Sequence, residues 1–253
     1  MTDQLFSLAG KTIIVTGGAK GIGRGVAEGL AARGASVHVF DRDETALEQL
    51  ASAATKGIAV RRLDVTDEAA VEAAFDEVTA GSGALDVVFA NAGIAGMPTP
   101  LAEHDYEAWR KVHAVNLDGV FLTARAAARR MLPQGHGKIV LTASTWGMRG
   151  TSVAPFTAYA SSKGAVVNLT RQLALELASK GITVNAIVPG GFATDMAAGV
   201  LDQAAETRLF EKMPMRRFVT PEAMVGTAVF LASEASDWVS GVLLPVDGGY
   251  LAE

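Results

Sequence analysis

Short apolar runs alternate with longer alanine-rich stretches along nearly the whole chain. The apolar runs are rich in β-branched residues, as in TIIVT at residues 12–16 and SVHVF at residues 36–40. They are continuous rather than alternating with polar positions, which is typical of a parallel sheet covered by helices on both faces. The pattern therefore predicts strands that each lead into a helix.

Seven strands and at least six helices follow from this pattern. The strands are expected at residues 12–16, 36–40, 58–65, 84–93, 137–144, 182–190 and 242–246. Helices are expected at residues 22–34, 43–55, 67–80, 105–131 and 221–233, and around Tyr159. This order predicts an α/β fold: a single doubly wound Rossmann-type domain over residues 1–253, with a seven-stranded parallel sheet and helices on both faces. Residues 190–220 break the rhythm with two short helical pieces, and we expect a substrate lid there.

Composition narrows the classes of function. The chain has 253 residues, of which 49% are hydrophobic, enough for a sizeable core. A net charge of −5 argues against nucleic acid and anionic membrane as partners. The chain has no cysteine and its four histidines lack HExxH spacing, so no metal site is expected. We expect no signal peptide and no membrane span, and we interpret the protein as cytoplasmic.

A glycine-rich turn joins the first strand to the first helix in TGGAKGIG at residues 16–23. Gly17, Gly21 and Gly23 would allow a tight turn, a close approach to a pyrophosphate and close packing of the helix on the sheet. The helix N-terminus would direct free N–H groups at the phosphates. Asp41 ends the second strand, where a carboxylate can bind the hydroxyls of an adenosine ribose. Alternatively, Asp41 is an ordinary helix-capping acid.

Tyr159 and Lys163 stand four residues apart in YASSK and would share one face of a helix. An adjacent ammonium stabilises a phenolate and so lowers the pKa of a tyrosine, which makes it a useful acid or base near neutrality. Taken alone, the pair is equally consistent with a surface Tyr–Lys contact without a role.

Four motifs in this order resemble the short-chain dehydrogenase/reductase family: TGGAKGIG, NAG at residues 91–93, a serine at the end of the fifth strand, and YxxxK. The resemblance extends from about residue 9 to VDGGY near the C-terminus. It implies reversible hydride transfer between a nicotinamide cofactor and a secondary alcohol or ketone, the small-molecule partner. An epimerase or dehydratase on the same fold and a non-catalytic dinucleotide sensor or scaffold are the alternatives.

The resemblance also implies a role for each matching residue. Tyr159 would be the general acid/base, Lys163 would lower its pKa and hold the nicotinamide ribose, Ser144 would bind the substrate oxygen, and Asn116 would support a proton relay. The residues expected at the cofactor are Gly17, Lys20, Gly21, Ile22, Gly23, Asp41, Arg42, Asp64, Val65, Asn91, Ala92, Gly93, Tyr159, Lys163, Pro189, Gly190, Phe192 and Thr194. The substrate is expected near Ser144, Trp146, Phe156, Tyr159 and Met196, with Met148, Phe210 and Met213 as further candidates for an apolar lining.

The sequence departs from the family pattern at two places. Ala90 stands where the family usually has the first asparagine of NNAG. Ser144 lies further before Tyr159 than is usual, which predicts a small insertion within residues 147–156.

Cofactor, assembly and substrate are less closely determined. Asp41 favours NAD because its carboxylate would repel a 2′-phosphate, whereas Lys20 and Arg42 leave NADP possible. A homotetramer is expected, with a dimer second, because relatives commonly associate through the C-terminal edge strand and the long helices, and an edge strand needs cover. A sugar or polyol, a 3-oxoacyl thioester, and a cyclic or aromatic ketone all remain open as substrates.

Overall fold

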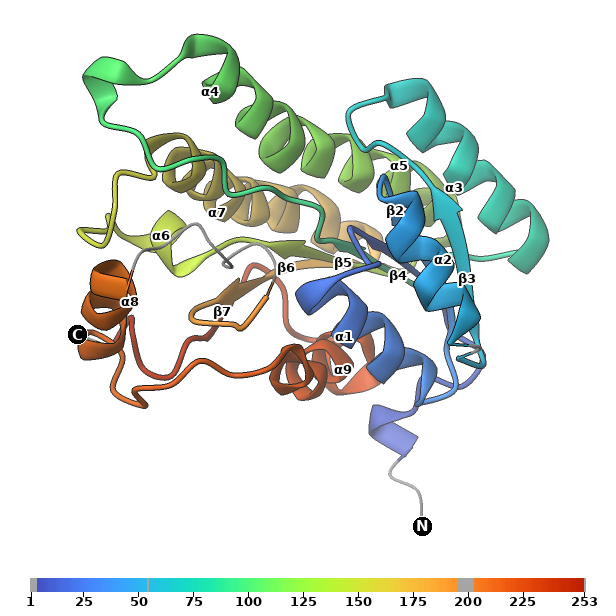
Figure 1. Cartoon of the computed structure of the whole chain (residues 1–253). Helices are drawn as coiled ribbons and strands as arrows, with labels where there is room; N and C mark the ends of the chain where they lie inside the picture. The colour runs from blue at the N-terminus through green and yellow to red at the C-terminus, as the bar shows by residue number, and fades with distance from the viewer. Residues whose placement is uncertain (1–3, 54, 195–202, 253) are drawn as a thin grey trace.

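Seven strands form a single all-parallel sheet at the centre of the protein, as the sequence predicts. The computed structural model describes residues 4–53, 55–194 and 203–252. The strands are β1 (Thr12–Thr16), β2 (Ser36–Asp41), β3 (Ile58–Arg62), β4 (Val87–Ala90), β5 (Gly137–Thr142), β6 (Ile182–Pro189) and β7 (Leu243–Val246). Their order in the sheet is β3-β2-β1-β4-β5-β6-β7 (Figure 1).

The strand order reverses beside β1. The chain runs outward from β1 to β2 and β3, then returns to place β4 on the other side of β1. Helices that follow the two strands leave in opposite directions, so a crevice forms at the carboxyl ends of β1 and β4. Doubly wound sheets bind their ligands at this point.

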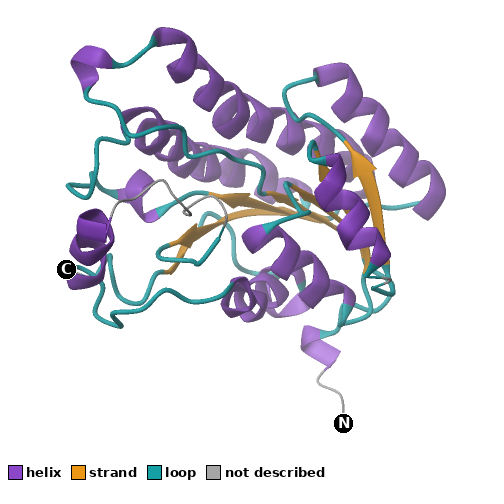
Figure 2. Cartoon of the chain, viewed as in Figure 1, coloured by secondary structure: helices purple, strands orange, loops and turns teal. Residues whose placement is uncertain are grey.

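Helices cover both faces of the sheet (Figure 2). One layer contains α3 (Glu68–Ser82), α5 (Gly119–Gln134) and α7 (Thr157–Leu177), and the other contains α1 (Gly21–Ala31), α2 (Glu44–Ser52) and α9 (Val225–Ala232). Successive strand residues point to opposite layers, so that Ile14 packs in the first core and Ile13 and Val15 in the second. Both faces are buried, which explains why the strands read as continuous apolar runs.

The long helix expected at residues 105–131 is interrupted. It consists of α4 (Tyr106–His113), a π-helical segment (Ala114–Asp118) and α5, which continues to Gln134. The side chain of Asn116, in the π-helical segment, hydrogen-bonds both the N–H and the carbonyl of Ile94. The Asn116 side chain thus contacts Ile94 from a segment in which the π turn contains one more residue than an α turn. The spacing of hydrophobic residues does not reveal this extra residue.

Several strands are shorter than expected, and at the carboxyl ends of β4 and β3 polar contacts take the place of backbone pairing. Beyond β4, the backbone N–H of Asn91 donates to the side chain of Thr16, and its Nδ2 donates to the carbonyls of Thr16 and Gly17. Beyond β3, Asp64 accepts hydrogen bonds from the backbone and side chain of Thr66. Strands 84–93 and 58–65 therefore end at Ala90 and Arg62.

The segment 190–220, where a lid is expected, is described in part. It contains α8 (Gln203–Glu211), while residues 195–202, including Met196, lie outside the described residues. Residues 147–156, where an insertion is predicted, contain the end of the short helix α6 (Thr145–Met148) and the loop that leads to α7.

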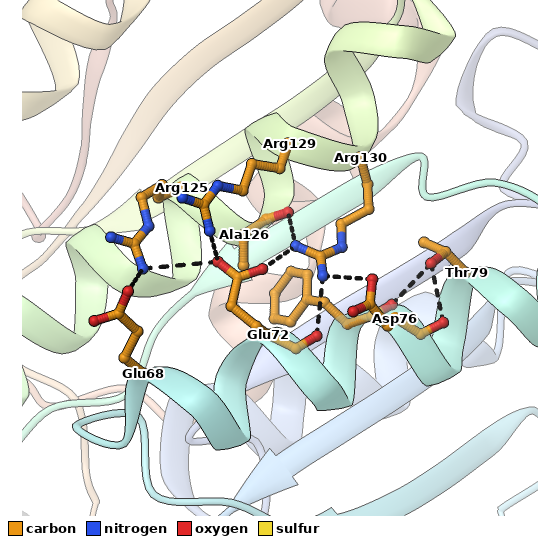
Figure 3. A network of polar contacts seen from close by, with 9 residues as sticks. Glu68, Glu72, Asp76, Thr79, Arg125, Ala126, Arg129 and Arg130 are labelled. Atoms are coloured by element: carbon orange, nitrogen blue, oxygen red, sulfur yellow. Dashed lines mark hydrogen bonds and ion pairs between the residues drawn. The ribbon is translucent and has the colours of Figure 1, made fainter.

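An ion-pair network joins α3 to α5 on the outside of the first helix layer (Figure 3). Glu72 accepts from Arg129 at 2.6 Å and also pairs with Arg130. Arg130 reaches Asp76 at 2.6 Å, and Arg125 reaches Glu68 at 2.6 Å. The network fixes the position of α5 relative to α3, and thereby supports the helix that continues into the π-helical segment.

Candidate active site

A cavity of about 940 Å³ opens at the carboxyl ends of the strands, at the point where the strand order reverses. Its walls combine the glycine turn after β1, the ends of β2, β4, β5 and β6, and residues of α4, α6 and α7. All of the residues expected at the cofactor line it, as do Ser144, Trp146 and Phe156 from the expected substrate region. The fold thus brings together residues from Gly17 to Tyr250, which are 233 positions apart in the sequence.

The glycine turn leaves no room for side chains. A Cβ on Gly17, whose φ is 63°, would lie 2.6 Å from the Cα of Ala92. A Cβ on Gly23 would lie 2.2 Å from the carbonyl oxygen of Gly17. Asn91 secures the turn from below by donating its Nδ2 hydrogens to the carbonyls of Thr16 at 3.2 Å and Gly17 at 3.0 Å.

The N-terminus of α1 differs from those of its neighbours. Helices α2, α3 and α4 begin with Asp43, Asp67 and Asp105, each of which accepts a hydrogen bond from a backbone N–H of its own helix. Helix α1 begins with Lys20, whose side chain makes no capping hydrogen bond. Because the tight glycine turn leads into this positive helix end inside the cavity, the residues fit the diphosphate of a dinucleotide.

Asp41 lies at the end of β2, beside the glycine turn. Its Oδ2 accepts from the Ala19 N–H at 3.1 Å and its Oδ1 accepts from the Asp43 N–H at 3.1 Å. Lys20 forms an ion pair with Asp43, with 2.5 Å between Nζ and Oδ2. The carboxylate expected to bind ribose hydroxyls is therefore fixed in position, and the neighbouring cation is held by a second acid.

Three polar side chains meet at the ends of β5 and α7. Ser144 follows β5 and caps α6, its Oγ accepting from the Trp146 N–H at 3.2 Å. The side chains of Ser144 and Tyr159 lie near one another in the cavity lining. Lys163, one helical turn further along α7, is 3% exposed and donates from Nζ to the Thr142 carbonyl at 2.8 Å. The i, i+4 spacing thus places the phenol and the ammonium in one wall, with Nζ 5.9 Å from the centre of the Tyr159 ring.

Burial dominates the proton affinities of this pair. Burial raises the pKa of Tyr159 above the usual value of a phenol, and the hydrogen bond with Ser144 lowers it in part. Burial lowers the pKa of Lys163 from 10.5 to about 8. The expectation that Lys163 lowers the pKa of Tyr159 is thus opposed by desolvation, and the ammonium is still the charged form at neutral pH.

Asn116 lies behind the cavity wall and is completely buried. Its Oδ1 accepts from the Ile94 N–H at 2.8 Å, and its Nδ2 donates to the Ile94 carbonyl at 2.9 Å and to Ser162 Oγ at 3.1 Å. Ser162 in turn donates to the Tyr159 carbonyl at 2.7 Å. Asn116 therefore links the loop after β4 to the backbone of the helix that carries the Tyr–Lys pair.

Aromatic side chains form the wall beside Tyr159. The Trp146 ring lies 6.1 Å from the Tyr159 ring, edge to face, and 5.0 Å from the Phe156 ring. Trp146 also packs against a cluster that includes Leu209 and Tyr250, both of which line the cavity. Trp146 and Phe156 thus form an aromatic wall next to Ser144, Tyr159 and Lys163, and the apolar surface continues over Leu209, Phe218 and Tyr250.

Sequence reasoning was less successful away from the motifs. Phe210 packs on the Phe218 ring at 4.7 Å, Met213 is buried beside Gly191 and Phe218, and Met148 is 38% exposed, so these three candidates lie outside the cavity lining. The cavity has further lining residues from the loop after β4 and the C-terminal region that the sequence did not reveal: Thr99, Glu103, His104, Asp105, Leu209, Phe218 and Tyr250. Only Tyr250 had a signal, as the last residue of VDGGY.

Two classes of site have no support within the described part of the chain. Residues 4–53, 55–194 and 203–252 contain no group of three or more His, Asp or Glu able to hold a metal ion. Over the same residues, no helix has the length and apolar character needed to cross a membrane.

Comparison with known proteins agrees with this geometry. A family model described as enoyl-(acyl carrier protein) reductase matches residues 17–251. The 5-keto-D-gluconate 5-reductase of Escherichia coli (strain K12) is 40% identical over 254 residues, covering 98% of each chain. The cis-4-hydroxycyclohexanecarboxylate dehydrogenase of Sinomonas cyclohexanicum is 41% identical over 249 residues, covering 97% of this chain and 98% of that one.

Solved structures show the same similarity. The crystal structure of a gluconate 5-dehydrogenase from Burkholderia cenocepacia J2315 in complex with NADP and tartrate superposes with a TM-score of 0.90 at 36% identity. The match covers 99% of this chain and 98% of that one, so it includes every wall of the cavity described above.

Proposed function

The chain belongs to the short-chain dehydrogenase/reductase family and is an NAD(P)-dependent oxidoreductase that interconverts a secondary alcohol and a ketone; we propose that it prefers NAD and acts on an alicyclic alcohol. The observation that carries the proposal is the aromatic wall of Trp146 and Phe156 beside Tyr159. An alicyclic ring presents apolar C–H faces that such a wall can cover, whereas an open polyol would leave its hydroxyls against apolar surface.

The residues of the cavity support one division of labour. The bound nicotinamide would accept or donate the hydride. In the oxidation direction, Tyr159 would take the hydroxyl proton of the substrate, and Ser144 would hydrogen-bond the oxygen as it becomes a carbonyl. Lys163 is charged below a pH of about 8 and would stabilise the phenolate that burial disfavours. In the reduction direction, Tyr159 would return the proton to the carbonyl oxygen.

Asn116 would act by positioning in this proposal. Its contacts to Ile94 and Ser162 hold the loop after β4 against α7, at the level of the Tyr–Lys pair. The proton relay that the family resemblance implies remains a proposal for this residue.

Substrate assays with matched compounds test the substrate class. We would assay cis-4-hydroxycyclohexanecarboxylate and gluconate with NAD⁺, following nicotinamide absorbance, because both carry a carboxylate and differ in the ring. We expect the ring compound to have the higher kcat/KM. Trp146→Ala should raise KM for the ring compound about tenfold or more, while Trp238→Ala, which alters a fully exposed tryptophan, should leave it unchanged. Oxidation of gluconate alone would overturn the proposal.

A polyol or sugar acid is the second candidate. Thr99, Glu103 and Asp105 supply polar groups to the cavity and could bind hydroxyls. The relatives named for keto-gluconate and gluconate favour the same class. Preferential turnover of gluconate in the assays above would select this candidate.

Asp41 supports the preference for NAD. Its carboxylate occupies the position where a 2′-phosphate would bind, and like charges there repel. The structural relative with bound NADP points the other way. We expect kcat/KM for NAD⁺ to exceed that for NADP⁺ by about tenfold, roughly 1.4 kcal/mol of discrimination. Equal or better use of NADP⁺ would refute the preference.

A homotetramer, with a dimer second, is part of the same proposal. Phe121 on α5 and Leu175 on α7 are exposed apolar side chains on helices that could pack between copies. A monomer mass by light scattering at micromolar concentration would reject both.

A cytoplasmic location and a covering role for residues 190–220 are also kept as proposals. Cell fractionation tests the location, and protease protection with and without substrate tests the covering role.

A further inference from the structure

We propose that Asp43 is a second determinant of cofactor choice, because its carboxylate holds Lys20 in an ion pair and withholds that cation from a 2′-phosphate. The inference rests on the proposed function, in which a nicotinamide dinucleotide binds along the glycine turn. From the sequence, the choice between NAD and NADP was attributed to Asp41, Lys20 and Arg42 alone, and the inference adds Asp43 to these residues.

The two residues are brought together by Asp41. One oxygen of Asp41 accepts from the N–H of Ala19, directly before Lys20. The other oxygen accepts from the N–H of Asp43 itself. The N-termini of α1 and α2 therefore meet at the ribose position, and Lys20 and Asp43 face one another with Nζ and Oδ2 2.5 Å apart.

The two oxygens of Asp43 have separate partners. Oδ1 accepts from the Ala46 N–H at 3.0 Å and caps α2, which fixes the carboxylate regardless of Lys20. Oδ2 is then directed at the ammonium. The hydrogen bond with Lys20 lowers the pKa of Asp43, so the carboxylate is charged throughout the neutral range.

This arrangement changes the charges that a 2′-phosphate would meet. Without Asp43, the ammonium of Lys20 would add to the guanidinium of Arg42 beside the single carboxylate of Asp41. With Asp43 in place, the ammonium of Lys20 is paired, and the carboxylate of Asp43 adds a second negative charge near the expected 2′ position of the ribose. A free ribose 2′-hydroxyl can donate to a carboxylate, so NAD tolerates both acids.

The substitution Asp43→Asn separates the two roles of the residue. Asparagine is as good an N-cap as aspartate, so α2 should be retained while the negative charge is lost. Asp67→Asn is the matched control, because Asp67 caps α3 in the same way, accepting from Ala70 N–H at 3.0 Å, and is outside the cavity lining. Lys20→Met in the Asp43→Asn background tests whether the released cation is the cause.

Calorimetric titration of the protein with NAD⁺ and NADP⁺ measures the effect without a substrate. We expect Asp43→Asn to improve the Kd for NADP⁺ about tenfold relative to that for NAD⁺, with the NAD⁺ affinity changed less than about twofold. Asp67→Asn should leave both affinities unchanged, and the double variant should lose the gain. Titration with 2′,5′-ADP and 5′-AMP should reproduce the same pattern on the adenosine half alone.

Three outcomes would decide against the inference. An unchanged ratio of affinities in Asp43→Asn would show that Asp43 does not influence the choice. A gain that persists in the double variant would exclude Lys20 as the cause. Failure of the unaltered protein to bind either dinucleotide would overturn the proposed function first, and is distinguished from the other two because it appears before any substitution.

Discussion

Replacement of Lys163 by methionine should stabilise the protein in the absence of cofactor, although it removes a residue proposed to act in the reaction. The ammonium is almost completely buried, with a hydrogen bond to the Thr142 carbonyl at 2.8 Å. Burial lowers its pKa from 10.5 to about 8. At about 1.4 kcal/mol for each pH unit, this difference corresponds to roughly 3 kcal/mol of unfavourable free energy when the buried group is charged.

The sign of the pH dependence follows from the two proton affinities. Between pH 8 and 10.5 the unfolded chain holds the proton more tightly than the folded chain does. The contribution of Lys163 to the free energy of unfolding therefore rises with pH over this window, and the penalty is complete only below a pH of about 8. Methionine has a similar length and no charge, and it gives up one hydrogen bond from a charged donor, worth about 2 kcal/mol.

We expect Lys163→Met to be more stable than the unaltered protein by about 1 kcal/mol at pH 7. For a chain of this length, that corresponds to a rise in Tm of about 2–4 °C. The advantage should shrink towards zero, or reverse, as the pH approaches 10.5. Thermal unfolding followed by circular dichroism between pH 6.5 and 10.5 measures both effects, with Lys180→Met at an exposed position as the control.

A Lys163→Met protein that is less stable at pH 7, or whose advantage is the same at pH 10, would refute the reasoning. Either result would mean that the buried ammonium is compensated by its surroundings. The same variant should lose both kcat and cofactor affinity, because the ammonium is proposed to act on the phenol and on the ribose.

Three further substitutions have expected outcomes. Tyr159→Phe should lower kcat by about 10²–10⁴ with dinucleotide affinity retained, and a variant that keeps more than about a tenth of kcat would assign the proton transfer to another group. Gly23→Ala should abolish dinucleotide binding in calorimetric titration, because the new Cβ would lie 2.2 Å from the Gly17 carbonyl oxygen. The control Gly226→Ala in α9, with open space around its Cβ, should bind normally, and equal affinities of the two variants would contradict the role of the turn. Glu72→Gln should lower the free energy of unfolding by about 1–2 kcal/mol, since it removes the central acid of the α3–α5 network. The control Glu77→Gln at the surface of α3 should change the free energy of unfolding by less than about 0.5 kcal/mol, and equal effects in urea unfolding would show that the network adds no stability.

Features encoded by local spacing were predictable from the sequence. The strands are predictable because both of their faces are buried, and the glycine turn because Gly17 and Gly23 tolerate no side chain. Tyr159 and Lys163 share a helix face by their separation alone. Each of these features depends on a short stretch of consecutive residues, so it can be predicted from that stretch of sequence alone.

Features that depend on the meeting of distant segments were not predictable. Lys20 and Arg42 read as cations available to a phosphate, and the pairing of Lys20 with Asp43 exists only because two helix N-termini converge on Asp41. Thr99 and Glu103 reach the cavity through a loop whose path follows from tertiary contacts. The spacing of apolar residues likewise cannot show that Asn116 lies behind the cavity wall and binds Ile94.

The π-helical segment makes the length of this part of the chain more important than its composition. Residues 108, 112 and 115 face the cavity on one side of the segment, and Val120 and Ala124 face the sheet on the other. Each residue turns a helix by about 100°. Deleting a single residue from 114–118 would leave an uninterrupted helix but rotate α4 by that angle, turning its cavity face aside and displacing Asn116. Evolution within this stretch should therefore admit many substitutions and almost no insertion or deletion, so an alignment gap here would mark a protein that has lost this site.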